Sequence, residues 1–210
     1  MSAPTPAEPE RYTDASRALL RERVLDAVHD LLAEATWSDV SMASVAKRAG
    51  TSRQTLYNAF GNRRDLAHAY IAREVDRFLA IVGEVVAQRA PDAHACLAGA
   101  LEIFLSAAGS HPLVRAISIS ESGDELLAML TTRGAPAVAE VPERLAALLS
   151  EHWPQVPTED AHLVAETLVR LALSHAGMPS GTPARVAADV GRVLGPFLDQ
   201  LLRQARAAGG

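Results

Sequence analysis

The sequence is poor in cysteine, in aromatic residues and in long apolar runs, and each shortage excludes a class of protein. The chain of 210 residues has one cysteine, Cys96, which excludes an internal disulfide and fits a reducing compartment. Aromatic residues make up 4% of the chain, and alanine and leucine are abundant, which favours helices packed on helices. The first twenty residues lack the apolar stretch of a signal peptide, and no apolar run reaches membrane length. We therefore expect an all-α, cytoplasmic protein without a membrane segment.

Residue patterns that support catalysis or metal binding are also missing. The seven histidines show no H-E-x-x-H spacing, a single cysteine allows no Cys-x-x-Cys pair, and there is no glycine-rich phosphate loop. Helical enzymes can assemble a site from distant positions, so an enzyme stays an alternative that the sequence disfavours. We expect no catalytic residues, no metal and no cofactor.

The most informative pattern lies in the segment SMASVAKRAGTSRQTLYNAFGNRRDL, which runs from Ser41 to Leu66. It predicts two short helices, separated by a tight turn in which Gly50 adopts a left-handed conformation. Ser41 and Ser52 are placed to cap the two helices. The positions spaced to face one shared core are Val45, Ala46, Leu56 and Phe60. This pattern is typical of a helix-turn-helix, whose second helix lies in the DNA major groove.

The local charge supports this interpretation. Between positions 41 and 64 there are five basic residues and no acidic ones, whereas the remaining chain has 15 basic and 25 acidic residues. The five are Lys47, Arg48, Arg53, Arg63 and Arg64. A local positive surplus on an acidic protein, whose formal net charge is −5, indicates a DNA-reading module and disfavours a nucleoid protein.

Together these positions resemble the DNA-binding domain of tetracycline-repressor-like (TetR-family) transcriptional regulators. The matching pattern is Ser41-x-x-x-Val45-Ala46-x-x-Ala49-Gly50-Thr51-Ser52-x-x-Thr55-Leu56-Tyr57-x-x-Phe60-x-x-Arg63-x-x-Leu66. The resemblance implies an N-terminal three-helix DNA-binding domain followed by a larger helical domain for effector binding and dimerisation. It further implies a homodimer that binds a palindromic operator in double-stranded DNA and responds to a small molecule.

Two positions depart from the family pattern. Thr51 stands where an aliphatic residue is usual, so its hydroxyl has to bond back to the preceding helix or turn toward a phosphate. Arg63 stands where lysine is usual, and its planar guanidinium suits a phosphate at least as well.

The predicted DNA contacts fall into two groups. Ser41, Ser52, Thr55, Tyr57 and Arg63 are expected on the sugar-phosphate backbone or the groove edge, with Tyr57 and Arg63 as phosphate clamps. Arg53 and Gln54, at the tip of the second helix, are expected to read base edges. Asn58 is expected to contact a base or a sugar, and Lys47 completes the set.

The sequence divides into a disordered tail (1–11), the helix-turn-helix domain (12–61) and the effector and dimerisation domain (62–210). A first helix is expected over about 13–35, with Leu19, Leu20 and Val24 starting its apolar face, and Trp37 and Val40 fill the core after it. Further helices are expected over 62–89, 92–108, in two short segments after 111 and 124, over 136–153 with Pro142 as a kink or second start, over 158–176, and from 183 onward.

The predicted dimer surface comes from the last two helices. Its continuous apolar stripe is formed by Val186, Val190, Leu194, Phe197 and Leu201. Gly191 and Gly195 would let a partner helix approach closely, and Pro196 should kink the helix. An intramolecular core is the competing explanation, and we expect the stripe to serve both.

The middle helices supply enough apolar residues between 97 and 130 to line a ligand cavity. The polar side chains that could anchor a ligand there are His94, His111, His162, His175, Arg115 and Arg133. The composition favours an apolar or amphipathic effector. The resemblance favours a repressor, and an activator with the same fold is the alternative.

Overall fold

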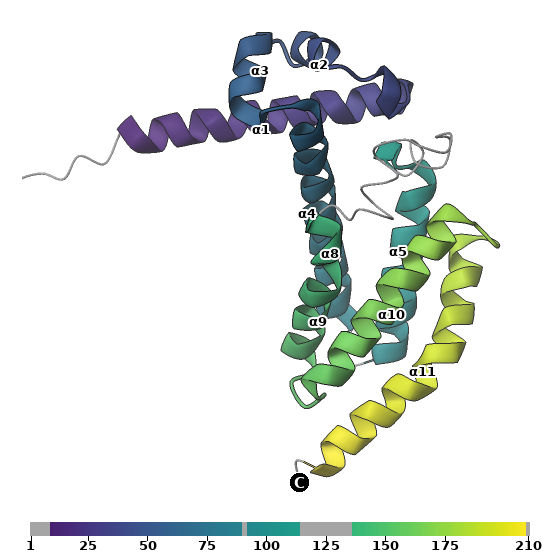
Figure 1. The fold of residues 1–210 in the computed structure, drawn as a ribbon. Helices are drawn as coiled ribbons and strands as arrows, with labels where there is room; N and C mark the ends of the chain where they lie inside the picture. The colour runs from purple at the N-terminus through teal and green to yellow at the C-terminus, as the bar shows by residue number, and fades with distance from the viewer. Residues whose placement is uncertain (1–8, 90–91, 114–135, 209–210) are drawn as a thin grey trace, which may run out of the picture. The chain divides into compact units, whose positions relative to one another are not determined.

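The computed structural model describes residues 9–89, 92–113 and 136–208, and these residues are predominantly helical (Figure 1). In chain order the helices are α1 (Pro9–Glu34), the 3-10 helix η1 (Trp37–Asp39), α2 (Met42–Arg48), α3 (Arg53–Phe60), α4 (Arg63–Arg89), α5 (Ala93–Ser110), α8 (Pro136–Ala139), α9 (Val141–His152), α10 (Thr158–Gly177) and α11 (Pro183–Ala208). No strand occurs among the described residues. The chain forms two compact units, Met1–Tyr70 and Ile71–Gly210, and their boundary falls within α4. The predicted all-α class is confirmed.

The core of the first unit joins α1, η1, α2 and α3. Val24 of α1, Val45 of α2 and Leu56 of α3 are fully buried, and burying each contributes about 1.5–3 kcal/mol. Trp37 and Val40 are also buried, at 1% and 2% exposure. Both therefore fill the core of this unit, as the sequence predicted.

Helix α1 differs from expectation in its start and in one side chain. It begins at Pro9 rather than near Thr13, and proline suits a first turn because its missing N–H would have no partner there. Leu19 is 68% exposed and does not belong to the apolar face. Successive helical residues are rotated by about 100°, which carries Leu19 away from the stripe that contains Leu20 and Val24.

In the second unit, prolines and glycines mark most helix boundaries. Pro142 lies in the first turn of α9, so the segment after Pro136 contains two helices rather than one kinked helix. Helix α10 ends at Gly177 and α11 begins at Pro183, as predicted. Gly109 does not stop α5, which continues for one more residue. A glycine in a last turn costs only about 1 kcal/mol, which the packing of α5 outweighs.

Helix α5 is the central helix of the second unit. Leu101 and Leu105 pack against Val186 and Val190 of α11 in one buried cluster, and α5 also contacts α10. The length and apolar composition of α5 would allow it to cross a membrane, but its contacts with α10 and α11 give it the environment of a protein core. Figure 1 shows α11 changing direction along its length, and Pro196 lies inside it, as expected for a kink.

Some expectations concern parts of the chain outside the described residues. These are the first eight residues of the expected tail and nearly all of the two short helices expected after 111 and 124.

Candidate nucleic-acid interface and internal cavity

Two serine caps begin the helices of the helix-turn-helix. Ser41 Oγ accepts a hydrogen bond from the amide of Ser44 at 3.1 Å, and Ser52 Oγ accepts one from the amide of Thr55 at 3.0 Å. Each cap contributes about 1 kcal/mol. The hydroxyl oxygens of Ser52 and Thr55 also lie 2.8 Å apart. Both predicted caps are confirmed, and both serine oxygens are engaged in them.

The turn between α2 and α3 requires a glycine. Gly50 has a φ of 63°, a left-handed conformation that side chains with a Cβ disfavour. The N–H of Thr51 donates to the carbonyl of Ala46 at 2.9 Å, which closes α2. Arg23 of α1 donates to the carbonyl of Ala49 at 2.5 Å. This last contact was not predicted from the sequence, because its two residues lie far apart in the chain.

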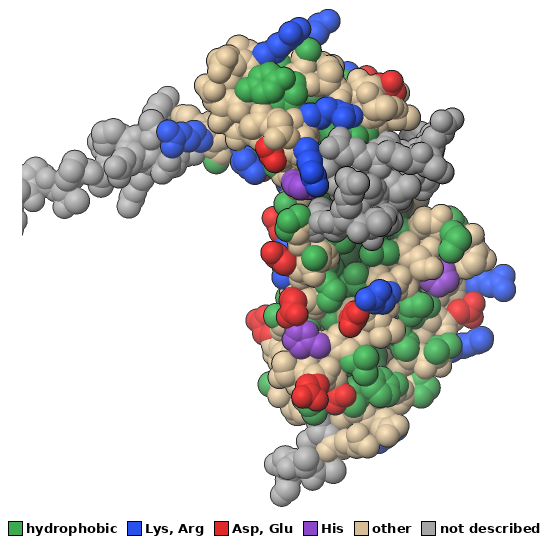
Figure 2. All heavy atoms as spheres, viewed as in Figure 1, with side chains coloured by type: hydrophobic (Ala, Val, Ile, Leu, Met, Phe, Trp, Pro, Cys, Tyr) green, Lys and Arg blue, Asp and Glu red, His purple; other side chains and the backbone are tan. Residues whose placement is uncertain are grey.

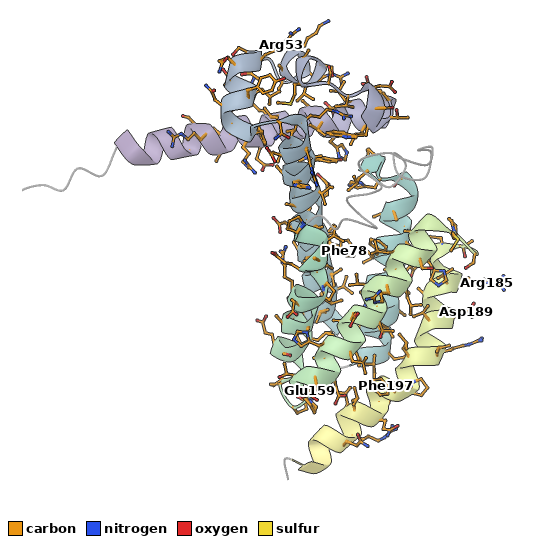
Figure 3. The ribbon with its side chains drawn as sticks, viewed as in Figure 1. Arg53, Phe78, Glu159, Arg185, Asp189 and Phe197 are labelled. Atoms are coloured by element: carbon orange, nitrogen blue, oxygen red, sulfur yellow. The ribbon has the colours of Figure 1, made fainter. Side chains whose placement is uncertain are left out.

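The outer face of α3 presents a row of polar side chains. Arg53, Gln54, Tyr57 and Asn58 are exposed, and Figure 3 places Arg53 at the outer edge of the helix-turn-helix. Gln54 Nε2 donates to Asn58 Oδ1 at 2.9 Å, so the two amides form one unit one helical turn apart. Tyr57 is 48% exposed, which leaves its ring and hydroxyl available to a partner.

Positive charge at this surface is concentrated in a hollow between α2 and α3. Lys47 and Arg53 line the hollow together with Ser44 and Thr51. Arg48 lies outside it and pairs with Glu34 at 2.7 Å, and this hydrogen bond lowers the pKa of Glu34. The predicted cation Lys47 therefore faces the hollow, while the charge of Arg48 is balanced within the protein.

Arg63 differs from the other predicted contacts because its guanidinium lies against the protein. Its Nε donates to the carbonyl of Val40 at 2.8 Å, and a terminal nitrogen donates to the carbonyl of Trp37. The guanidinium also stacks 4.4 Å from the centroid of the Trp37 ring. Arg63 thereby connects the first turn of α4 to η1.

The second unit contains a partly open apolar cavity of about 100 Å³. Its wall combines residues of α4, α5, α9, α10 and α11 with Trp153 and Val156 from the connection between α9 and α10. Phe78 of α4, labelled in Figure 3, meets Phe104 of α5 in this wall, and the two rings lie edge to face with their centroids 4.8 Å apart. None of the described residues in the wall is charged. Such a cavity suits a hydrocarbon group.

The sequence analysis identified part of this wall. Leu97, Leu101 and Phe104 of α5 line the cavity as expected, but the contributions of α4, α9, α10 and α11 were not predicted. The anchors that do not line the cavity are His94, His111, His162 and His175. Arg115 and Arg133 lie outside the described residues.

Cys96 lies in the cavity wall and is 3% exposed. Burial raises the pKa of its thiol to about 11. The thiol is therefore neutral at physiological pH, as suits a buried, structural cysteine.

A buried ionic cluster joins α4 to the end of α5. Glu74 pairs with Arg73 at 2.9 Å and accepts a hydrogen bond from His111 Nε2 at 3.0 Å. Burial alone would raise the pKa of Glu74, but the hydrogen bonds with His111 and Arg73 together outweigh burial and lower the pKa. Glu74 is therefore held as a carboxylate.

The apolar stripe of α11 is used largely within the protomer. Val186 and Val190 are buried against α5, and Leu201 is buried in the cavity wall. Leu194 is half-buried against the same cluster as Val186. Phe197 is 39% exposed (Figure 3). Intramolecular packing thus accounts for most of the stripe, and a role of these residues between subunits stays a prediction.

The two glycines of α11 accommodate a side chain of the same protomer. A Cβ at Gly195 would overlap the imidazole of His94, and a Cβ at Gly191 would lie 3.3 Å from its Cε1. From the sequence, these glycines were expected to allow the close approach of a partner helix. In the structure α5 packs closely against them, because the imidazole of His94 fills the space that the two missing side chains leave.

Comparison with known proteins matches both parts of the chain to one family. Residues 24–70 match the model described as bacterial regulatory proteins, tetR family, and residues 92–196 match the model described as bacterial tetracyclin repressor, C-terminal domain. The HTH-type transcriptional regulator AlkX of Mycobacterium tuberculosis is 35% identical over 189 residues, which is 90% of each chain.

Solved structures give the same result. The TetR family repressor AlkX from a Dietzia species has a TM-score of 0.74 at 33% identity, over 87% of this chain and 96% of that one. FadR from Bacillus subtilis, solved in complex with stearoyl-CoA, has a TM-score of 0.56 at 18% identity, over 82% and 96%. The second likeness concerns the fold alone.

Proposed function

Because this chain belongs to the TetR family of bacterial transcriptional regulators, we propose that it is a repressor that binds a palindromic operator as a homodimer and is released by an apolar effector. It acts as a regulator rather than as an enzyme, and it acts in the cytoplasm, where the DNA is. The observation that carries this proposal is the exposed polar row of α3, whose first turn is capped by Ser52. The uncharged cavity of the second unit supports the effector.

Operator reading is assigned to α3 and its surroundings. Arg53 has the geometry for a bidentate pair with guanine, and the joined amides of Gln54 and Asn58 present donors and acceptors to an adjacent base pair. Tyr57 and Lys47 reach phosphates on either side. The full proposed set of contacts is Ser41, Lys47, Ser52, Arg53, Gln54, Thr55, Tyr57 and Asn58, and Arg63, predicted from the sequence as a phosphate clamp, lies against η1.

One helix-turn-helix contacts only a few base pairs of DNA, so two copies are needed for useful sequence specificity. The proposed dimer supplies them. Helices α10 and α11 expose large apolar side chains, which Figure 2 shows as hydrophobic patches over this part of the unit. These exposed side chains are Leu163, Leu173, Met178, Val193 and Phe197. Of the predicted stripe, only Phe197 belongs to them, so we assign the interface to the exposed faces of both helices.

The effector is assigned hydrocarbon chemistry. The described residues of the wall include no charged side chain that could partner a polar headgroup, so we assign the buried part of the effector to an apolar chain. An engineered cavity of about 150 Å³ holds benzene, so a cavity of about 100 Å³ admits only a few carbon atoms as it stands. The Dietzia relative is implicated in biodegradation of n-alkanes, which fits this chemistry.

Release from DNA follows from the difference in size between a long apolar chain and the cavity. We expect a longer chain to widen this partly open cavity, so that it binds better to a conformation in which the helices around the cavity have separated. Only such a difference in affinity shifts the equilibrium away from the DNA-binding conformation.

The first experiment selects bound duplexes from a random DNA pool and titrates the selected sequences against salt. We expect a palindrome whose affinity falls steeply with salt. Linear alkanes and fatty acids of increasing length are then titrated onto the complex, and we expect release to strengthen with chain length. A folded dimer that enriches no sequence would overturn the proposed function, and release by charged, polar metabolites alone would overturn the effector class.

A further inference from the structure

Arg63 occupies an unusual position for a cation. It is the first residue of α4, and the positive end of a helix dipole disfavours a positive side chain there. Its neighbour Arg64 is exposed, whereas Arg63 is half-buried. The position of Arg63 therefore has to be stabilised by a partner, and the structure contains one in η1.

Three contacts join Arg63 to η1 and the residue after it. Arg63 donates to the carbonyls of Val40 and Trp37, and its guanidinium lies over the Trp37 ring. The Trp37 carbonyl already accepts from the N–H of Val40 at 3.1 Å and uses its second lone pair for Arg63. The Val40 carbonyl lies at the end of η1, where backbone carbonyls carry partial negative charge, so a guanidinium fork suits this pair of acceptors. The indole N–H of Trp37 is buried without a partner among the described residues, so the ring is held by packing and by this stacking contact.

The clamped segment leads directly into the helix-turn-helix. Val40, which accepts from Arg63, immediately precedes Ser41, the cap of α2. The arginine thus fixes the backbone one residue before the cap of α2, and it does so from α4. A lysine could not reproduce this arrangement, because an ammonium group is a point charge without a planar face or a fork of donors.

We propose that Arg63 is a positioning residue, which supports operator binding by clamping η1 and the cap of α2 to α4 rather than by holding a phosphate. This inference rests on the proposed binding of an operator. It changes the role of Arg63 within that function from a contact with DNA to a contact that orders the reading surface.

The salt dependence of operator binding separates the two roles. Each phosphate contact contributes about 0.9 to the slope of log affinity against log salt, so losing one contact per protomer would reduce the slope of a dimer by about 1.8. For Arg63→Gln we expect affinity to fall about tenfold at every salt concentration, with the slope unchanged. Lys47→Gln, which removes an exposed cation of the proposed interface, should reduce the slope.

Thermal unfolding of the full chain gives a readout that needs no DNA. Arg63→Gln should lower the unfolding midpoint by about 5 °C. Arg64→Gln is the matched control, because it removes the same charge from the same helical turn without touching η1, and its midpoint should equal that of the wild type. Arg63→Lys keeps the charge, and we expect it to lose both stability and affinity, again with an unchanged slope.

An Arg63→Gln midpoint equal to that of the wild type, or a slope reduced by about 1.8, would overturn the positioning role. If Arg63→Gln does not fold, Arg63→Lys decides, and wild-type affinity and midpoint in that variant would overturn the proposal. If the wild type binds no duplex, the proposed function fails. The unfolding midpoints of the Arg63 and Arg64 variants still decide the clamp in that case.

Discussion

In the unit that ends at Tyr70, the side chains assigned to DNA come from one short stretch of chain. In the unit that begins at Ile71, the cavity wall is drawn from five helices and a connection. The first unit exposes its functional groups on a surface whose backbone is fixed by local caps and a glycine turn. The second buries its functional surface, and that surface exists only because distant helices pack together. A DNA-binding surface can therefore be specified by a short segment of the sequence, whereas a cavity depends on how several distant helices pack together.

Removing a core side chain from the first unit should have the largest effect. Leu56 of α3 is fully buried, so Leu56→Ala should lower the free energy of unfolding of this unit by about 2–5 kcal/mol and abolish operator binding. The fluorescence of Trp37 reports on this unit and that of Trp153 on the cavity wall. When Leu56→Ala is titrated with denaturant, the fluorescence of Trp37 should change at a lower denaturant concentration than that of Trp153. Leu19→Ala, at a position that is 68% exposed, should change stability by less than about 0.5 kcal/mol. A single shared transition would mean that the two units do not unfold separately.

A larger side chain at Gly195 tests the packing of α11 against α5, which the sequence alone did not specify. Gly195→Ala would push a methyl group into His94 and should destabilise by about 1–3 kcal/mol. His94→Ala should restore most of this loss, and a double-mutant cycle measures the coupling. Gly109→Ala is the matched control, since nothing lies within 4 Å of its added Cβ and a helical alanine should stabilise slightly. Additive effects of the two substitutions at 94 and 195 would contradict the contact.

Two substitutions on α3 test which residue reads a base and which contacts the DNA backbone. Arg53→Ala should relax preference at one base pair of each half-site, at a cost of about 1–3 kcal/mol. Tyr57→Ala should weaken binding to all sequences by a similar factor and leave the preference intact. Selection from a random pool with each variant measures both effects. A uniform loss with Arg53→Ala would show that another residue reads the base.

The same contrast explains how far the sequence could lead. Ser41, Gly50 and Ser52 act on backbone groups within five residues of themselves, so their roles in the helix-turn-helix were predictable from spacing alone. Val186 and Val190 lie on an apolar stripe whose period predicts a buried face but does not specify which helix buries it. The partner of Gly195 is His94, about a hundred positions away in the chain. Arg63 was assigned to a phosphate because its pattern position suggested one, whereas its contacts with Trp37 and Val40 depend on how η1 and α4 meet.

The smallest expected effect concerns the ionic cluster of the second unit. The folded-state pKa of Glu74 lies below its ordinary value of 4.5, so the stability that this carboxylate contributes is fully present above 4.5 and is lost as the pH falls from there through the folded-state pKa. Above about pH 5, Glu74→Gln should therefore be less stable than the wild type by a constant amount, because Arg73 keeps a buried charge without its carboxylate. Below about pH 4.5 the difference should shrink, and thermal unfolding between about pH 3 and pH 7 measures it. Glu84→Gln, at an exposed position of the same helix, is the control. A difference between wild type and Glu74→Gln that stays constant across this range would show that the carboxylate is no better stabilised in the folded chain than in the unfolded one.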